Sequence, residues 1–389
     1  MERTGSGTNP AQTATSEGCG YHWPAADRRA LSLRAIKMPM QRGRTPVGER
    51  LPTLEDVARV AGVSRATVSR VINGIRNVDP QLHEMVWHAV GQTGYVPNRL
   101  ARSLVTRRTG TVALVVSDSE AHDDDPFMGR FFADPYFGRV VGGLMSVLRQ
   151  AGVQLALQIV GSDDGRKRLV GDLRNGQADG VIVLSLPAVD PLPRMLTEGG
   201  VPSVMIGRPS EPVPINYVDL ANDTGASLAA EHLLGLGRQR IGMISGPADV
   251  PASHDRINGF RRSLARRGHG WVPMRAGNFT QESGETAMRA LLAEQPDLDG
   301  VFVANDLMAL GALLALREAG RRVPEDVAIV GFDDSSAAMA ASPTLTTIRH
   351  PLEDMAAEAA RLLLARIEDP EMRVSSVIYE PTLVRRQSA

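Results

Sequence analysis

The chain has 389 residues, of which 43% are hydrophobic and 22% charged, and its formal net charge is −1. This length fits two or three domains, and the hydrophobic fraction excludes a wholly disordered chain. The single cysteine excludes an intramolecular disulfide framework and any multi-cysteine metal site within one chain, and it fits a reducing cytoplasm. No stretch approaches the roughly 20 apolar residues that span a bilayer, so no membrane-spanning helix is predicted.

The charge is unevenly distributed along the chain. Residues 41–110 contain 11 Arg, no Lys and 5 acidic residues, a net charge of +6. Residues 1–40 carry 5 basic and 3 acidic groups, so residues 111–389 carry −9. A basic early segment joined to an acidic body is typical of a nucleic-acid-binding module attached to a carrier domain.

Residues 1–50 are rich in Gly, Ser, Thr, Pro, Gln and Arg, show no sustained periodicity, and are predicted to be a disordered tail. The apolar part of 30–40 is interrupted by Arg34 and Lys37, which argues against a signal peptide. An equally weighted alternative is that translation begins at Met38 or Met40, in which case Cys19 is absent from the natural protein.

Residues 51–73 predict two short helices separated by a tight turn. Thr53 can cap the first helix with Asp56 as its capping-box partner, and Gly62 supplies the turn. Ser64 can cap a second helix that ends near Ile72. The inner face of the first helix is assigned to Val57, Ala58, Val60 and Ala61. The second helix turns Arg65, Ala66, Thr67, Ser69 and Arg70 outward, and these side chains suit base edges and phosphates. The pattern therefore indicates a DNA-binding helix-turn-helix; the alternative is a generic amphipathic helical hairpin.

A third helix is predicted over Asp79–Gly94, with Pro80 at its start. His83 and His88 are five residues apart and point about 140° away from each other, so a shared metal ion is not expected. Asn98 can then cap a short helix from Arg99 to about Val105.

From Thr111 onward, apolar strand-like segments alternate with helix-like segments, which predicts parallel, doubly wound sheets. Two such sheets in about 280 residues predict two lobes with a cleft between them, where ligands bind near the carboxyl ends of strands. The expected strands are Val112–Val116, Val153–Val160, Gly180–Leu184, Ser203–Ile206, Ile241–Ser245, Gly300–Val303 and Val327–Val330. The expected helices are Tyr136–Gly152, Asp164–Asn175, Thr224–Leu236, Arg256–Arg267, Ser283–Glu294 and Leu307–Ala319.

Polar residues that follow these strands are candidate ligand-binding groups. Asn305 and Asp306 follow one strand, Asp333 and Asp334 follow another, and Arg256 is expected to open a helix. Forks of Arg, Asp and Asn beside aromatic faces bind sugar hydroxyls, and Phe279, Tyr136 and Phe137 are the candidate aromatic faces. Three alternatives stay open: Asp306 as the cap of a helix beginning at Leu307, Asp334 as a loop or capping group, and Phe279 as plain core.

The stretches "TLEDVARVAGVSRATVSRVIN" and "GYVPNRLARSL" resemble the lactose/galactose repressor (LacI) family of bacterial transcription regulators, and the match continues almost to the C-terminus. The resemblance implies that the second helix lies in the major groove and that Arg65 and Ala66 set specificity. It also implies a hinge helix over Arg99–Val105, whose Leu104 wedges into the minor groove. The residues assigned to DNA binding are Thr53, Ser64, Arg65, Ala66, Thr67, Ser69, Arg70, Asn73, Asn98, Arg99, Ala101 and Leu104.

The resemblance further implies a periplasmic-binding-protein-like effector domain whose lobes exchange strands. The assigned effector-binding residues are Tyr136, Phe137, Arg208, Arg256, Phe279, Asn305 and Asp333. Two departures from the family pattern put the effector in doubt. Arg208 stands where some sugar-binding members have a carboxylate, which makes a phosphorylated or acidic ligand conceivable. The long loop over 117–134, with its run of Asp residues, is a candidate lid, although solvated loop charge is favoured over a cation site.

The expected fold class is an all-α helix-turn-helix headpiece followed by an α/β domain of two doubly wound parallel-sheet lobes. The expected segments are a tail (1–50), a headpiece (51–97), a hinge helix (98–109) and an effector and dimerisation domain (110–389). Within the last, one lobe comprises about 110–219 and 351–378, and the other about 220–348 and 379–388.

The expected function is a homodimeric transcription regulator that binds a pseudo-palindromic double-stranded operator, most simply as a repressor of carbohydrate-utilisation genes under a sugar-like effector. No phosphate loop, dinucleotide-binding glycine motif or Gly-x-Ser-x-Gly elbow occurs, so no enzymatic activity is expected. No cofactor, metal or membrane partner is expected, and the expected location is the cytoplasm, associated with the nucleoid. The alternatives are a solute-binding protein of a transport system and an activator or global regulator of the same architecture.

Overall fold

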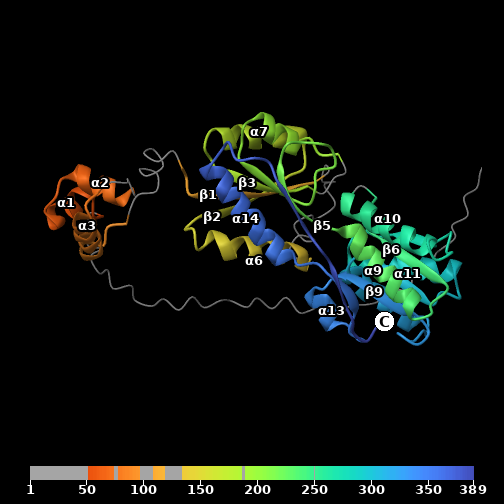
Figure 1. The fold of residues 1–389 in the computed structure, drawn as a ribbon. Helices are drawn as coiled ribbons and strands as arrows, with labels where there is room; N and C mark the ends of the chain where they lie inside the picture. The colour runs from red at the N-terminus through yellow and green to blue at the C-terminus, as the bar shows by residue number, and fades with distance from the viewer. Residues whose placement is uncertain (1–50, 74–77, 97–107, 119–133, 186–188, 249) are drawn as a thin grey trace, which may run out of the picture. The chain divides into compact units, whose positions relative to one another are not determined.

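The structure is a computed structural model that describes residues 51–73, 78–96, 108–118, 134–185, 189–248 and 250–389. Its elements form a three-helix unit followed by two six-stranded sheets with helices packed on them (Figure 1). The predicted tail, the hinge residues Asn98, Arg99, Ala101 and Leu104, and most of the candidate lid lie outside the described residues. Within the described residues, no helix is both long and apolar enough to cross a membrane.

The three-helix unit comprises α1 (Leu54–Ala61), α2 (Arg65–Ile72) and α3 (Pro80–Thr93). At α1, the Thr53 N–H and Oγ1 both donate to Asp56 Oδ2, at 2.9 and 2.8 Å. Gly62 has a φ of 66°, the left-handed conformation that the turn requires. The Ser64 hydroxyl accepts the Thr67 N–H at 3.1 Å. The predicted helices and caps are therefore confirmed.

The core of this unit is a cluster of small and β-branched side chains that includes Val57, Val68, Val71 and Val86. The assignment of Val60 to this core is wrong, since its side chain is 46% exposed. It lies about 100° around the helix from the centre of the stripe that Val57, Ala58 and Ala61 form, so it faces neither neighbouring helix.

The first sheet has the strand order β11-β5-β4-β3-β1-β2, and its paired strands are parallel. Alternate residues of β1 belong to two different buried clusters, so this strand is covered on both faces. Helices α6 and α14 lie side by side on one face (Figure 1), whereas α7 and α8 supply the cluster on the other. The strands are β1 (Thr111–Ser117), β2 (Gln154–Val160), β3 (Gly180–Ser185), β4 (Ser203–Ile206), β5 (Asn216–Leu220) and β11 (Ser376–Tyr379), and the helices are α6 (Pro135–Leu148), α7 (Asp163–Arg174), α8 (Leu192–Glu198) and α14 (Leu352–Glu368).

The second sheet has the order β12-β10-β9-β8-β6-β7. In the described part of the chain, its edge strand β12 is antiparallel to its neighbour and the other paired strands are parallel. Helices α9 and α10 pack against each other, as do α11 and α12. The strands are β6 (Ile241–Ser245), β7 (Met274–Ala276), β8 (Gly300–Val303), β9 (Ala328–Asp333), β10 (Thr346–Arg349) and β12 (Thr382–Val384), and the helices are α9 (Asn222–Gly235), α10 (Pro251–Ala265), α11 (Gln281–Glu294), α12 (Asp306–Glu318) and α13 (Ser336–Ala340).

The chain passes between the two sheets three times. It leaves the first sheet after β5, returns after β10, and crosses again between β11 and β12. Polar residues at these crossings are therefore shared between the two sheets, which is how the fold assembles the site described below.

Several expected elements differ from those observed. The helix expected to open at Arg256 begins at Pro251, because proline at the first helical position supplies the required φ. Arg256 consequently lies in the second turn. The strands β5, β7, β10, β11 and β12 are absent from the expected set, because each is short and mixes polar with apolar residues, which leaves no clear period.

The contact between α6 and α14 depends on a glycine. A Cβ placed on Gly143 would lie 2.3 Å from the Glu353 carbonyl oxygen, whereas a Cβ on Gly142 would meet nothing within 4 Å. We predict that Gly143→Ala lowers the free energy of unfolding by about 1–3 kcal/mol, because the two helices must separate. The matched variant Gly142→Ala should leave this free energy unchanged or raise it by up to about 1 kcal/mol. Denaturant unfolding measures both, and an equal loss in the two variants would contradict the close-packing argument.

Candidate functional site

The outward surface of α2 is the candidate DNA-reading surface. Arg65, Ala66 and Arg70 are exposed, whereas Thr67 and Ser69 are half-buried. Within the described residues the Arg70 side chain has no hydrogen bond or ion pair, so its guanidinium is free to bind an external acceptor. Arg65 lies 3.1 Å from the carboxylate of Glu55, and because both side chains are largely exposed this ion pair is weak and readily exchanged.

Several other residues assigned to DNA binding form hydrogen bonds that fix the surface of α2. The Ser64 and Thr67 hydroxyls share a 2.9 Å hydrogen bond, and Asn73 Nδ2 donates to Ser69 Oγ at 3.2 Å. Thr53 caps α1, and its hydrogen bonds to Asp56, together with Arg59, lower the pKa of that carboxyl to about 2. The cap is therefore ionised and intact at neutral pH.

The second candidate site centres on Arg256, whose side chain is only 6% exposed. Its Nε donates to Asn222 Oδ1 at 2.9 Å and its Nη1 to the Ala304 carbonyl at 2.5 Å. The guanidinium carbon lies 3.6 Å from the centre of the Phe332 ring, a cation–π contact. Burial lowers the pKa of Arg256, while the nearby Asp333 opposes this shift. An arginine nevertheless keeps its proton, so the site contains a fixed positive charge that is largely shielded from water.

Asp333 lies beside this charge at the end of β9. Its Oδ1 is 3.9 Å from Arg256 Nη2 and 3.4 Å from His350 Nδ1. Its φ is 109°, a left-handed conformation that is strained for a residue with a side chain and typical of functional sites. Burial lowers the pKa of His350 despite Asp333, and its buried Nε2 has no hydrogen-bond partner in the described part of the chain.

The neighbouring acids Asp306 and Asp334 hold loops in place. Asp306 accepts hydrogen bonds from the Ser335 N–H and hydroxyl and from the Thr347 hydroxyl. The expectation that Asp306 caps α12 is wrong, because Asn305 is the cap and accepts the Met308 N–H at 2.9 Å. Asp334 pairs with Arg349 and Arg386, which confirms it as a loop group.

Asn305 connects the cap of α12 to the aromatic residue Phe279. Its Nδ2 donates to the Phe279 carbonyl at 3.0 Å, and Phe279 has a φ of 68°. The Phe279 ring is half-buried and packs against the core cluster of α11 and α12. A Cβ on Gly246 would lie 2.3 Å from this ring, so the ring needs a glycine at the end of β6.

The first sheet contributes a second set of polar groups. Asp134 caps α6 by accepting the Tyr136 N–H at 2.9 Å, and the Tyr136 ring lies 6.1 Å from the His350 ring. Burial raises the pKa of Asp134 to about 6, and burial together with Asp333 raises the pKa of Tyr136. Phe137 lies edge-to-face with Tyr136 but is buried in the core, so it supports Tyr136 from below.

Two arginines link elements of the two sheets. Arg139 on α6 donates to the carbonyls of Asp333 and His350 at 2.9 and 2.8 Å and makes a bidentate pair with Glu353. Arg208, in the loop after β4, donates to Asp255 on α10 at 2.6 Å. The Arg208 guanidinium, the candidate partner of an acidic ligand, is thus already paired with a carboxylate.

We use the name polar cluster for Asp134, Tyr136, Arg256, Asp333 and His350, which these contacts bring together. Asp219, at the end of β5, is electrostatically coupled to Tyr136 and Arg256, and burial raises its pKa. The acidic groups Asp134, Asp219, Asp255 and Asp333 outnumber the cations Arg208 and Arg256. Such a site disfavours an anion and suits the many hydroxyl donors of a neutral polyol. In the described residues, no group of three or more His, Cys, Asp or Glu side chains is placed to hold a metal ion.

Two family models match parts of this chain. Residues 53–98 match the family model of bacterial regulatory proteins of the lacI family, and residues 230–389 match the periplasmic binding protein-like domain. The transcriptional regulator CelR of Thermobifida fusca is 46% identical over 344 residues, covering 87% of this chain and 98% of that protein. The ribose operon repressor of Escherichia coli K12 is 31% identical, with 87% and 100% covered.

Two solved structures share the fold. A CelR–cellobiose complex has 43% identity and a TM-score of 0.67, covering 87% of this chain and all of that one. A Lac repressor dimer bound to operator and the anti-inducer ONPF has 27% identity and a TM-score of 0.72, covering 87% and 99%.

The chain belongs to the LacI family. It is therefore a DNA-binding transcription regulator rather than an enzyme, with a helix-turn-helix headpiece and a two-lobed α/β domain of the periplasmic-binding type. Members of this family bind operator DNA and small-molecule effectors.

Sequence reasoning missed five residues of the polar cluster and its immediate surroundings: Asp134, Arg139, Asp219, Asn222 and His350. Asp219 and His350 follow the same rule as Asp333, since each lies at or just past the end of a parallel strand. The signal was lost because β5 and β10 were not recognised as strands. Arg139 and Asn222 carry no such signal, because their roles depend on contacts between distant segments.

The raised pKa of Asp134 makes a testable prediction about stability. A carboxyl that ionises near pH 4 in the unfolded chain and near pH 6 in the folded protein favours folding at low pH, and this contribution is lost as the pH rises through that window. Asp134→Asn, which keeps a capping side chain, should flatten the fall in unfolding free energy between about pH 4 and 6. Denaturant unfolding at several pH values measures this. Asp164→Asn, at an exposed carboxyl of α7, controls for the lost charge, and an unchanged pH profile in Asp134→Asn would contradict the assignment.

Proposed function

We propose that this regulator is a homodimeric repressor of carbohydrate-utilisation genes, and that an uncharged sugar bound at the polar cluster sets its affinity for a pseudo-palindromic operator. The observation that carries the proposal is that every guanidinium near the polar cluster is already engaged within the protein, while carboxylates outnumber cations. A sugar supplies the hydroxyl donors that such a site lacks.

The effector-contacting residues we propose are Tyr136, Arg256, Phe279, Asn305 and Asp333. Arg256 and Asp333 would bind hydroxyls, and the rings of Tyr136 and Phe279 would cover apolar C–H faces. Two further residues would act indirectly: Phe137 would support the ring of Tyr136, and Arg208 would hold Asp255. The relative solved with cellobiose, which is 43% identical, supports a neutral sugar over the phosphorylated alternative.

The DNA-contacting residues we propose lie on α2 and in the hinge. Arg65 and Arg70 would carry direct readout, and Ala66 sets shape because it cannot form a bidentate hydrogen bond. Bases or phosphates would also be contacted by Thr67, Ser69 and Asn73. Two further residues, Thr53 and Ser64, would contact DNA in addition to capping their helices. The proposed hinge helix contributes Asn98, Arg99, Ala101 and Leu104. We propose that the headpiece comprises residues 51–97, the hinge helix 98–109, and the effector and dimerisation domain 110–389.

A homodimer is supported by exposed apolar side chains on a sheet edge. Leu157 and Ile159 lie on β2, the edge strand of the first sheet, and are 41% and 36% exposed. Two-fold symmetry of the protein would match a pseudo-palindromic site. Binding of sugar and operator would be linked reciprocally, with a coupling of about 1–3 kcal/mol. We place this activity in the cytoplasm, at the nucleoid, because that is where operator DNA is found.

Arg70→Ala should weaken operator binding by about 5- to 150-fold, the loss expected for about 1–3 kcal/mol of guanine or phosphate contact. Fluorescence anisotropy with an operator selected from a random duplex pool measures this loss. The matched variant Arg70→Lys keeps the charge but not the planar fork, so it should recover non-specific binding and not specificity. Wild-type operator affinity in Arg70→Ala would refute the role of this side chain.

Asp333→Asn should abolish release of operator by the sugar while operator affinity changes less than about threefold. The sugar is found by titrating the operator complex with cellobiose and other neutral sugars, and with the corresponding sugar phosphates. Release by a neutral sugar supports the proposal, whereas release only by sugar phosphates would overturn the charge argument. Asp334→Asn is the comparison variant, because its carboxylate already pairs with Arg349 and Arg386.

A further inference from the structure

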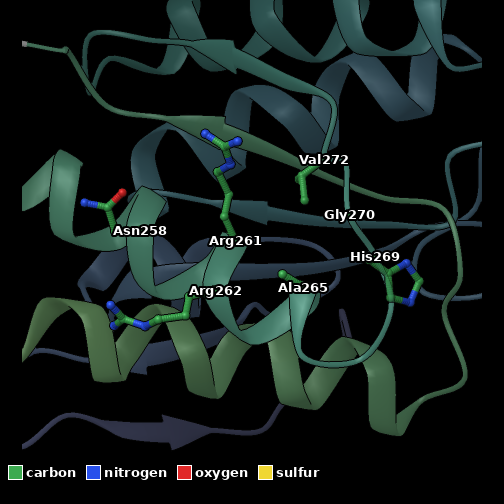
Figure 2. A pocket seen from close by; sticks show the side chains of 7 residues that line it. All are labelled: Asn258, Arg261, Arg262, Ala265, His269, Gly270 and Val272. Carbon is green, nitrogen blue, oxygen red and sulfur yellow. The ribbon is translucent and has the colours of Figure 1, made fainter.

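A basic pocket lies on the outer side of α10, apart from the polar cluster. It has a volume of about 390 Å³ and is lined by Asn258, Arg261, Arg262, Ala265, His269, Gly270 and Val272. Figure 2 shows that the first four project from successive turns of α10 and that the other three belong to the segment that follows the helix. A pocket of this size accommodates a small organic ligand.

The charge of this region is opposite to that of the rest of the body. Residues 257–281 contain five Arg and no acidic residue, although 111–389 carry a net charge of −9; one of the five, Arg275, pairs with Glu294. Within the described residues, the side chain of Arg261 has no hydrogen bond or ion pair. Trp271, between two lining residues, is 68% exposed. A free guanidinium group beside imidazole and amide donors is the chemistry that recognises a phosphate group.

The second arginine of the pocket leads toward the polar cluster. Arg262 Nη2 donates to Asp223 Oδ2 at 2.7 Å, and both side chains are about half exposed. Such an exposed pair is weak, so a phosphate that binds Arg262 can displace Asp223. Asp223 is adjacent in sequence to Asn222, whose Oδ1 accepts the Nε–H of Arg256 at 2.9 Å.

The helices α9 and α10 are also in close contact at this point. A Cβ on Gly259 would lie 2.1 Å from the Asp223 carbonyl oxygen, so the first turn of α9 rests directly on the backbone of α10. A change at Arg262 therefore acts on the segment that holds Arg256, and Arg256 is itself on α10.

We propose that this basic pocket is a second ligand site, that it binds the phosphate monoester of a small molecule, and that its occupancy is transmitted to Arg256 through Asp223 and Asn222. Arg261 and Arg262 project to different sides of α10 (Figure 2), so both side chains would turn toward the phosphate, with His269 and Asn258 as further hydrogen-bond partners. The pocket is distinct from the sugar-binding residues proposed above, so the two proposals fail independently.

Calorimetric titration of the full-length protein tests the site. The ligands are glucose 6-phosphate and adenosine 5′-monophosphate at constant ionic strength, with glucose and adenosine as unphosphorylated controls. We expect saturable binding of one phosphate ester per chain, weakened at least tenfold by Arg261→Ala. Arg168→Ala, which removes an exposed arginine of α7 without a partner in the described residues, should bind like wild type. The ester that binds identifies a sugar phosphate or a nucleotide as the source.

Three results would overturn the site. The first is absence of saturable binding by either ester, and the second is equal weakening in Arg261→Ala and Arg168→Ala. The third is loss of ester binding in Asp333→Asn, which would place the ester at the polar cluster instead. Binding of non-operator DNA through Arg261, without binding of either ester, would identify a polyanion surface and also contradict the proposal.

Amide hydrogen exchange tests the transmission without knowledge of the effector. Saturation with the bound ester should change the exchange of residues 221–226 in the wild type, because Asp223 loses its partner. In Asp223→Asn, which keeps the helix but lacks the ion pair, the ester should still bind and the exchange change at 221–226 should be at least halved. A change confined to residues 258–272 in the wild type would overturn the transmission.

Discussion

A buried guanidinium, that of Arg256, is the constraint around which the polar cluster is arranged. A charge removed from water must have its hydrogen bonds satisfied, because an unpaired buried ion costs several kcal/mol. Its partners come from the start of α9, the end of β8 and the end of β9, so one side chain fixes three segments that are distant in the sequence. The ring of Phe332 beneath it adds a cation–π contact. The arginine is thereby a structural centre, and in the proposed function it is also a preformed binding group.

Bonds between the two sheet units surround this centre. Arg139 on α6 holds the backbone of Asp333 and His350, and Arg208 holds Asp255 on α10. Each of these bonds joins elements of different sheets, so each is sensitive to how the sheets are oriented. A ligand that contacts both sheets would favour one orientation, and this differential affinity is what a regulator needs to couple effector to operator.

The strained backbone beside these groups fits the same interpretation. Phe279, Asp333 and Asp334 are non-glycine residues with positive φ, and each is held by surrounding hydrogen bonds or ion pairs. Such conformations persist only where neighbours enforce them. Asp306 is one of these neighbours, because it accepts hydrogen bonds from Ser335 in the loop after β9 and from Thr347 on β10. Asp306 and Asp334 are thus committed to contacts within the protein, whereas Asp333 is the acid proposed to bind the effector.

The sequence by itself determined the local features of this protein. The caps Thr53 and Ser64, the turn glycine Gly62 and the charge asymmetry identified the headpiece, because capping and turn chemistry depend on residues a few positions apart. The alternation of strands and helices likewise determined the fold class, and strand-end polarity found Asn305 and Asp333. Only the tertiary structure decided that Asp306 is structural, that Arg208 is already paired, and that Asp134, Asp219 and His350 join Arg256. These facts depend on three chain crossings and on short strands that mix polar with apolar residues, so no local pattern encodes them.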